Sequence, residues 1–224
     1  MGTIWIFLTC FVVPFGLLSM FVKKNKRCLL TFGIGALTFF VSQVLLRIPL
    51  LEWWQSHAST QVWIIANSFL YVLLLSFSAG LFEETGRLVS FKLLKKTDTL
   101  YEAIAFGLGH GGIEAILLVG VPALSQTLSL ENALLAGSER IAAILVHITL
   151  SIVIFIGVKK GQNLLYWALA VMLHGLFNLI PLMITYLSGP LFLSECVLFT
   201  LAIGLFVGVY FLMIKEYIKD EKIF

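Results

Sequence analysis

The sequence predicts an all-α, polytopic membrane protein: a bundle of about seven transmembrane helices with a polar site between the central ones. Three observations lead to this prediction. Of the 224 residues, 60% are hydrophobic and only 12% are charged, whereas soluble domains carry about 25% charged residues. The apolar runs are about 20 residues long, which is the length of a helix that crosses a bilayer. All eleven lysines fall in alternate connections or in the C-terminal tail.

Polar or basic stretches divide the chain into seven apolar segments. Pro122 is expected to stop the fourth segment, and residues 123–138 are expected to form a longer, partly helical loop. No connection is long enough for a soluble domain, so residues 1–224 are expected to form one membrane domain, with the motif-bearing core at about 62–187. The expected spans are 3–22, 29–50, 62 into the basic cluster at 92–96, 100–121, 139–158, 163–187 and 193–214.

The lysines also predict the orientation. They follow the first, third and fifth segments and the last one, and the alternate loops hold none. The positive-inside rule therefore places the N-terminus outside and the C-terminus inside. The N-terminus has no basic stretch before its apolar run, which favours a retained helix over a cleaved signal peptide. The basic residues act as topology signals, so no nucleic-acid partner is expected; the partner is the lipid bilayer.

The third segment carries Glu83, Glu84 and Arg87 within an otherwise apolar helix. An ionisable side chain at membrane depth costs at least ~2.5–3.5 kcal/mol on insertion scales, so these groups require partners or a function. Glu83 and Arg87 are four residues apart and are expected to pair on one helix face. Glu84 points about 100° away, towards other helices.

Other polar groups are predicted to reach a similar depth. Counted from the nearest basic cluster, Glu83 lies nine residues along its segment, His147 twelve, and His110 and His174 fourteen. Since each helical residue rises about 1.5 Å, four segments bring a proton-handling side chain to a similar level, and one shared site is expected. Three pairs share a helix face by their spacing: His110 with Glu114, in a glycine-rich stretch, His174 with Asn178, and Arg140 with His147.

This set of side chains suits the hydrolysis of a peptide bond. That reaction needs an activated water, a donor for the developing oxyanion and an acid for the leaving amine. Glu83 and Glu84 could activate the water, with His174 and Asn178 as oxyanion donors. Alternatively, His110, His147 and His174 with a glutamate could hold zinc, which takes three protein ligands and a water in catalytic sites. There is no HExxH motif, so the sequence leaves open whether a zinc cofactor is present. Gln43 and Arg47 are expected to be structural or interfacial, and His57, in an outer loop, to play no part.

Five pieces of the chain resemble the YhfC-type family of bacterial membrane peptidases: SQVLLRIPLL (42–51), FEETGR (82–87), GLGHGGIEA (107–115), ERIAAILVH (139–147) and HGLFN (174–178). They fall in order over residues 40–180. More distantly, EExxR, a following histidine and HxxxN are similar to the motifs of the CAAX prenyl protease and bacteriocin-processing superfamily and of PrsW-type proteases.

The resemblance implies roles for particular residues. Glu83 and Glu84 would supply the base and Arg87 would orient them, while His110, His174 and Asn178 would complete the site. The second motif reads GHGGIE instead of FxxxH, which puts the roles of His110 and Glu114 in doubt, and His147 and Arg140 have no counterpart in the three-motif pattern. The resemblance to the YhfC-type family also implies a multi-pass protein of the bacterial plasma membrane.

The expected function is that of an intramembrane endopeptidase acting on a membrane-associated protein or peptide, reached from the cytoplasmic side or laterally from the bilayer. Two alternatives stay open. A proton-coupled carrier could use the same glutamates and histidines as a relay, although the repeated halves frequent in carriers are not visible here. A non-enzymatic regulator or immunity protein could keep the fold alone, although it would not need every polar group.

Overall fold

The computed structural model describes residues 1–94, 97, 99–125, 128–187 and 189–221 and contains helices and no strand over that range. Seven helical stretches within the described residues are long and apolar enough to cross a membrane. The protein is therefore a multi-pass helical membrane protein, as predicted. We number the stretches spans 1 to 7, in chain order: Gly2–Lys24, Arg27–Gln55, Ser68–Leu93, Leu100–Ser125, Leu130–Lys159, Asn163–Tyr186 and Leu191–Lys219.

Three spans are single α-helices: α6 (Ser68–Leu93), α9 (Leu130–Lys159) and α10 (Asn163–Tyr186). Each of the others includes a short π-helical segment, marked η. Span 1 consists of α1 (Gly2–Phe7), η1 (Leu8–Val12) and α2 (Val13–Lys24), and span 2 of α3 (Cys28–Phe39), η2 (Phe40–Arg47) and α4 (Ile48–Gln55). Span 4 consists of α7 (Leu100–Ala115), η3 (Ile116–Gly120) and α8 (Pro122–Ser125), and span 7 of α11 (Leu191–Val209), η4 (Tyr210–Ile214) and α12 (Lys215–Glu221). The short helix α5 (Ala58–Ala66) precedes span 3.

Several boundaries differ from those expected, and three of them have a clear local cause. Span 3 begins at Ser68 instead of at 62, because the backbone leaves the helical region at Asn67 (φ −129°, ψ 43°) and the preceding residues form α5. Span 5 begins at Leu130 instead of at 139, because the side chain of Ser129 caps its first turn. Pro122 does not end the fourth segment; it opens α8, where a missing backbone N–H leaves no helical hydrogen bond unmade.

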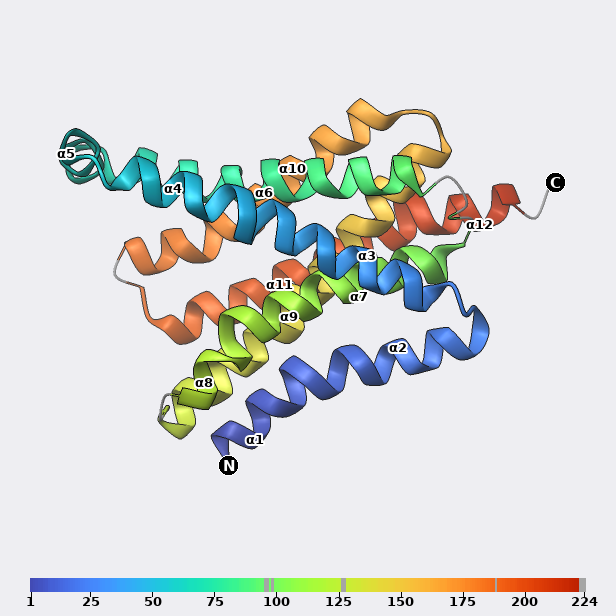
Figure 1. Cartoon of the computed structure of the whole chain (residues 1–224), viewed down its shortest axis with the longest axis horizontal. Helices are drawn as coiled ribbons and strands as arrows, with labels where there is room; N and C mark the ends of the chain where they lie inside the picture. Colours follow the sequence, from blue (N-terminus) through green and yellow to red (C-terminus); the bar gives the residue numbers. More distant parts are fainter. Residues whose placement is uncertain (95–96, 98, 126–127, 188, 222–224) are drawn as a thin grey trace.

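Helix α9 runs through the middle of the bundle and packs against α6, α7, α10 and α11 (Figure 1). The largest hydrophobic cluster extends from it towards the lysine-rich end of the spans. Phe91 of α6 stacks near Phe106 of α7, with 4.6 Å between ring centroids, and Phe155 of α9 meets Tyr217 of α12 at 5.8 Å. This end of the bundle is therefore a packed core.

Spans 2 and 4 cross closely and then separate. A Cβ on Gly35 of α3 would fall on the carbonyl oxygen of Phe106, and a Cβ on Gly109 of α7 would fall on that of Phe32. Only glycine allows the two backbones to come so near. Beyond this crossing the spans diverge, so that α4 and α8 lie far apart at the left of Figure 1.

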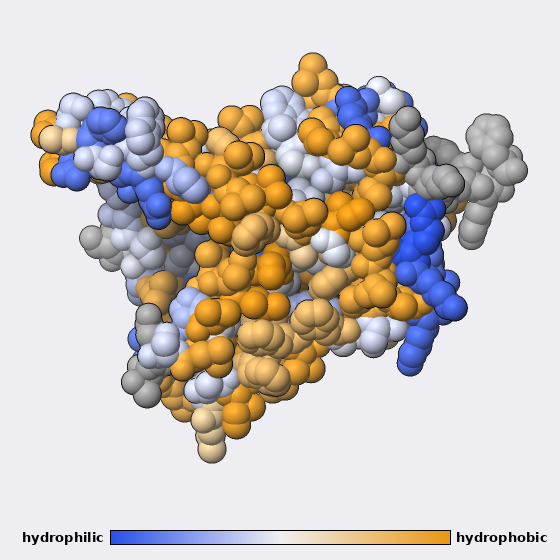
Figure 2. Space-filling model, viewed as in Figure 1, coloured by the Kyte–Doolittle hydropathy of each residue, from blue (hydrophilic) through white to orange (hydrophobic). Residues whose placement is uncertain are grey.

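The surface agrees with a membrane environment. Figure 2 shows apolar side chains across the middle of one face, with hydrophilic side chains gathered at its two ends. The basic residues at the end of α2 and in the short link to α3 mark one of these ends: Lys23, Lys24, Lys26 and Arg27.

Candidate active site

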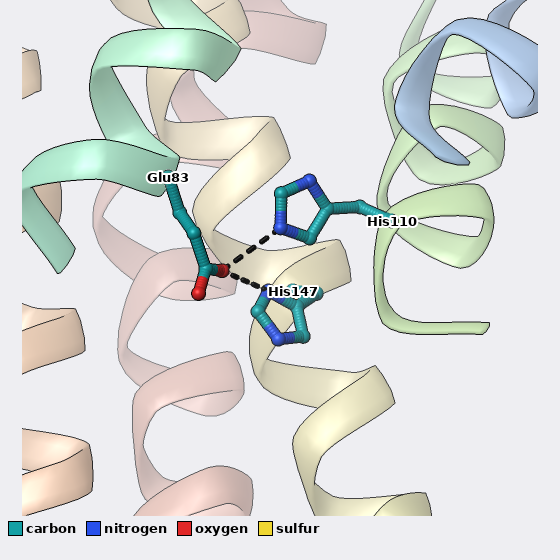
Figure 3. A group of neighbouring side chains, drawn as sticks. All are labelled: Glu83, His110 and His147. Carbon is teal, nitrogen blue, oxygen red and sulfur yellow. Dashed lines mark hydrogen bonds and ion pairs between the residues drawn. The ribbon is translucent and has the colours of Figure 1, made fainter. Parts of the chain in front are cut away.

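Four helices bring their polar side chains to one point inside the bundle. Nε2 of His110, on α7, lies 2.8 Å from Oε2 of Glu83, on α6. Nδ1 of His147, on α9, lies 3.8 Å from the same oxygen, and Nε2 of His174, on α10, lies 3.9 Å from it. All four side chains are buried, and Figure 3 shows the first three facing one another. One carboxylate oxygen is thus the common neighbour of three imidazoles.

Glycines on α7 set the spacing of these groups. A Cβ on Gly107 would lie 2.7 Å from the carbonyl oxygen of His147, so α9 can approach α7 only because that position has no side chain. One turn further on, a Cβ on Gly111 would lie 3.1 Å from Cδ2 of His147. The ring of His110 stands edge-on to Phe39, with centroids 5.4 Å apart, which fixes its orientation by packing.

Glu84 forms the second part of the site. Both of its oxygens accept from Nη1 of Arg87, at 2.6 and 2.7 Å, and Oε1 also accepts from Nδ1 of His174 at 2.8 Å. The ion pair of Arg87 is therefore with Glu84, three residues away. The expected pairing with Glu83 was wrong, because Glu83 turns towards the histidines and Gln43.

The ring of His147 is held from both sides. Nη2 of Arg87 donates to Nδ1 at 3.1 Å, so the ring proton is on Nε2, which faces Oε2 of Glu114 at 2.5 Å. The other oxygen of Glu114 pairs with Arg140 at 2.9 Å, and Arg140 also pairs with Glu139. Glu114 and His110 were expected to share a helix face and interact. Instead, Glu114 of α7 contacts His147 of α9.

Gln43 is a site residue that the sequence interpretation missed. Its side-chain amide donates to Oε1 of Glu83, and its own oxygen accepts from Arg47 at 3.0 Å. Arg47 also binds Ser78 and the carbonyl oxygen of Leu75. One sequence signal could have pointed to Gln43 and Arg47 as site residues: both lie in SQVLLRIPLL, one of the five pieces that resemble the YhfC-type family. By contrast, His57 is exposed, and its ring contacts only Trp53 among the described residues, through a hydrogen bond to the carbonyl oxygen and an edge-on packing of the two rings.

A cavity of about 600 Å³ leads away from the site. Glu83, His147 and His174 lie in its wall, whereas His110, Glu84 and Arg87 are fully buried behind them. Asn178, one turn along α10 from His174, also lines the cavity. The volume is within the roughly 300–1,000 Å³ of small-ligand sites, so a substrate segment could reach the cluster.

The residues present suit a metal ion. One side-chain atom each of Glu83, His110 and His147 lies within 4.8 Å of the other two. Two imidazoles and one carboxylate form a ligand set of catalytic zinc sites. The carboxylate of Glu114 on the second nitrogen of His147 is the outer partner that metal-binding histidines usually have. The sequence had grouped His174 with the two histidines, whereas the compact group contains Glu83 in its place.

The charge of the cluster favours a cation. Four carboxylates (Glu83, Glu84, Glu114, Glu139) meet three guanidinium groups (Arg47, Arg87, Arg140). With neutral imidazoles the sum is one negative charge in excess. Burying an unbalanced charge is costly, and either a bound cation or a proton on one imidazole would offset this excess.

The fold and the site together define a class: a multi-pass membrane protein with a buried glutamate–histidine centre at the end of a cavity. The family described as YhfC intramembrane metalloprotease matches residues 9–133 and 121–198. The chain belongs to this YhfC family. It is also 31% identical, over 209 residues, to the uncharacterized membrane protein YhfC of Bacillus subtilis (strain 168), which covers 75% of this chain and 78% of the relative. No solved structure matches.

Proposed function

We propose that the protein is an intramembrane endopeptidase that hydrolyses a peptide bond of a membrane-associated protein or peptide, in a bacterial plasma membrane. The observation that carries this proposal is the convergence of Glu83, His110 and His147 in one buried group beside a cavity. The family's description as a metalloprotease supports it. A structural ion pair would need no third and fourth partner from other helices.

Glu83, His110 and His147 would hold the metal, for which their donor atoms suit zinc. Nδ1 of His147 would then exchange its contact with Arg87 for the ion, while Nε2 keeps its contact with Glu114. When bound, such an ion supplies Lewis acidity and an activated water at neutral pH. Gln43 holds one oxygen of Glu83 and leaves the other directed at the imidazoles.

His174 would move the proton. Its Nδ1 donates to Glu84, which Arg87 fixes with two hydrogen bonds, so the ring is oriented with Nε2 towards Glu83. In the neutral ring this nitrogen carries a lone pair. It could accept a proton from the attacking water and return it to the leaving amine, as general acid–base catalysis requires.

Asn178 would stabilise the oxyanion. Its side chain lines the cavity one turn from His174, and an amide N–H directed at a developing negative charge is worth about 10²–10³-fold in rate in related chemistry. A donor on the same helix as the proton-moving histidine keeps both groups in a fixed relation to the substrate.

The test combines metal content with peptide-bond cleavage. Purified wild type should hold about one zinc per chain by mass spectrometry, as a single site with three protein ligands requires. Glu83→Gln and His110→Ala should each lose the metal, and His57→Ala, the matched exposed control, should keep it. New N-termini should appear in membranes of cells with the wild type and not in those with Glu83→Gln. Identical N-termini in both would refute the peptidase, whereas cleavage by a well-folded, metal-free wild type would refute only the metal.

A further inference from the structure

The cavity extends from the site in one direction only. Its wall is formed on α6 by part of residues 75–83, on α9 by part of 139–147 and on α10 by part of 174–185. In each helix the site residue is at one end of this stretch, and the rest runs towards the end of the span that carries no lysine. The N-terminal part of α11 completes the wall through Leu191 and Glu195.

The opposite direction is closed. Glu84, Arg87 and His110 are fully buried beneath the cavity. Below them, towards the lysine-rich ends, Phe106 and Phe155 belong to the packed hydrophobic cluster. The cavity beside the site therefore does not extend to the lysine-rich ends, where access from the cytoplasmic side would begin. A second cavity of about 720 Å³, between span 2 and α6, does reach Leu94 near those ends, but Glu83, Glu84 and His110 do not line it.

The wall also points to a side entrance. Span 2 contributes Gln43, Arg47 and Ile48 to the cavity, and span 4 contributes Glu114 and Leu118. These are the parts of the two spans that lie beyond their close crossing, where the helices diverge (Figure 1). An entrance between them would face the lipid.

We propose that the substrate is a membrane-anchored polypeptide, cleaved where its chain leaves the extracytoplasmic half of the bilayer, and that it enters between the outer parts of spans 2 and 4. The lysines indicate on which side of the membrane cleavage takes place, because the lysine-poor ends of the spans face away from the cytoplasm under the positive-inside rule. The anchor would stay in lipid while an extended segment reaches Glu83 through the cavity. The cleavage itself rests on the proposed function; the direction of access does not.

Thiol labelling from one side of the membrane tests the direction. In a Cys196→Ala background, in which Cys10 and Cys28 are buried, single cysteines are placed at two neighbouring alanines of α9. Ala143 lines the cavity, whereas Ala142 lies in the packed core. A membrane-impermeant thiol reagent added to intact cells should label Ala143→Cys and leave Ala142→Cys unlabelled.

Three further positions complete the experiment. Thr185→Cys, near the outer end of the cavity wall, should label from outside, as should the exposed His57→Cys. Lys160→Cys should label only in inverted vesicles. Labelling of Ala143→Cys and Thr185→Cys from the inner side alone would overturn the proposal, and so would labelling of Lys160→Cys in intact cells.

Labelling needs no catalysis. The same pattern should therefore appear in the Glu83→Gln variant, and a chain that shows this pattern but cleaves nothing would refute the peptidase and not the direction of access. The entrance is tested by tethering bulky thiol adducts at Ile48→Cys and Leu118→Cys. Cleavage of membrane-anchored proteins should fall in both, and unchanged cleavage in both would place the entrance elsewhere.

Discussion

Replacing Gly107 with alanine should separate α7 from α9 and disturb the proposed metal-binding group of Glu83, His110 and His147. The new Cβ would lie 2.7 Å from the carbonyl oxygen of His147 and 2.8 Å from the amide nitrogen of Ile148, whereas ordinary contact begins at 3.4 Å. The Cα of Ile148 would lie closer still, so the helices must move apart by about 1 Å. Overpacking of this kind costs about 1–3 kcal/mol of folding free energy, and a displacement of about 1 Å at a catalytic group lowers activity on the order of 10²-fold.

Two measurements check this effect without knowledge of the substrate. Thermal unfolding in detergent should show a lower Tm for Gly107→Ala, and competition with a chelator should show weaker metal binding, because His147 moves relative to His110. Gly33→Ala is the matched control, since its Cβ would meet nothing within 4 Å; it should leave both quantities unchanged or raise the Tm slightly. A Gly107→Ala protein with the Tm and metal affinity of the wild type would refute the argument that this glycine sets the spacing.

Three other changes have expected outcomes. Glu114→Gln should weaken metal binding about 10–100-fold, the usual effect of losing an outer partner of a metal-binding histidine, as measured by chelator competition. Arg87→Met should destabilise the protein by about 3–5 kcal/mol because it leaves a buried carboxylate unpaired, whereas Lys160→Met, which breaks an exposed pair, should cost about 0–1 kcal/mol; equal shifts in Tm would contradict this. Gln43→Leu should slow cleavage and cost about 1–3 kcal/mol of folding free energy, because Glu83 and Arg47 each lose a buried hydrogen-bond partner; unchanged kinetics would assign Gln43 to packing alone.

The level of the site could be predicted because helices rise uniformly. Counting residues from the lysine clusters placed Glu83, His110, His147 and His174 at a similar depth, and the structure brings these side chains together. Counting residues along a helix gives the depth of a side chain but does not tell which neighbouring side chain it will pair with. Both Glu83 and Glu84 are within one turn of Arg87, and the choice of Glu84 depends on His174, which comes from another helix.

Gln43 shows a different limit. It lies in η2, where the π-helical turns change which residues face inward compared with a regular α-helix. A periodicity of 3.6 residues therefore misplaces the inner face of span 2, and the sequence alone gave no reason to move Gln43 and Arg47 from the membrane surface to the wall of the cavity. The direction of the cavity could not be predicted either, because counting residues along the helices gives the depth of the site but not the shape of the space beside it.

The packed half of the bundle has an electrical consequence. Water in the cavity beside the site would shorten the insulating layer of the membrane, and a charge crossing the membrane potential gains about 2.3 kcal/mol per 100 mV. The aromatic cluster around Phe106 and Phe155 must then sustain nearly the whole potential across the remaining thickness. A membrane protein built in this way can admit water to a buried site without becoming a proton leak, and thinning that cluster should reveal itself first as loss of the cell's membrane potential.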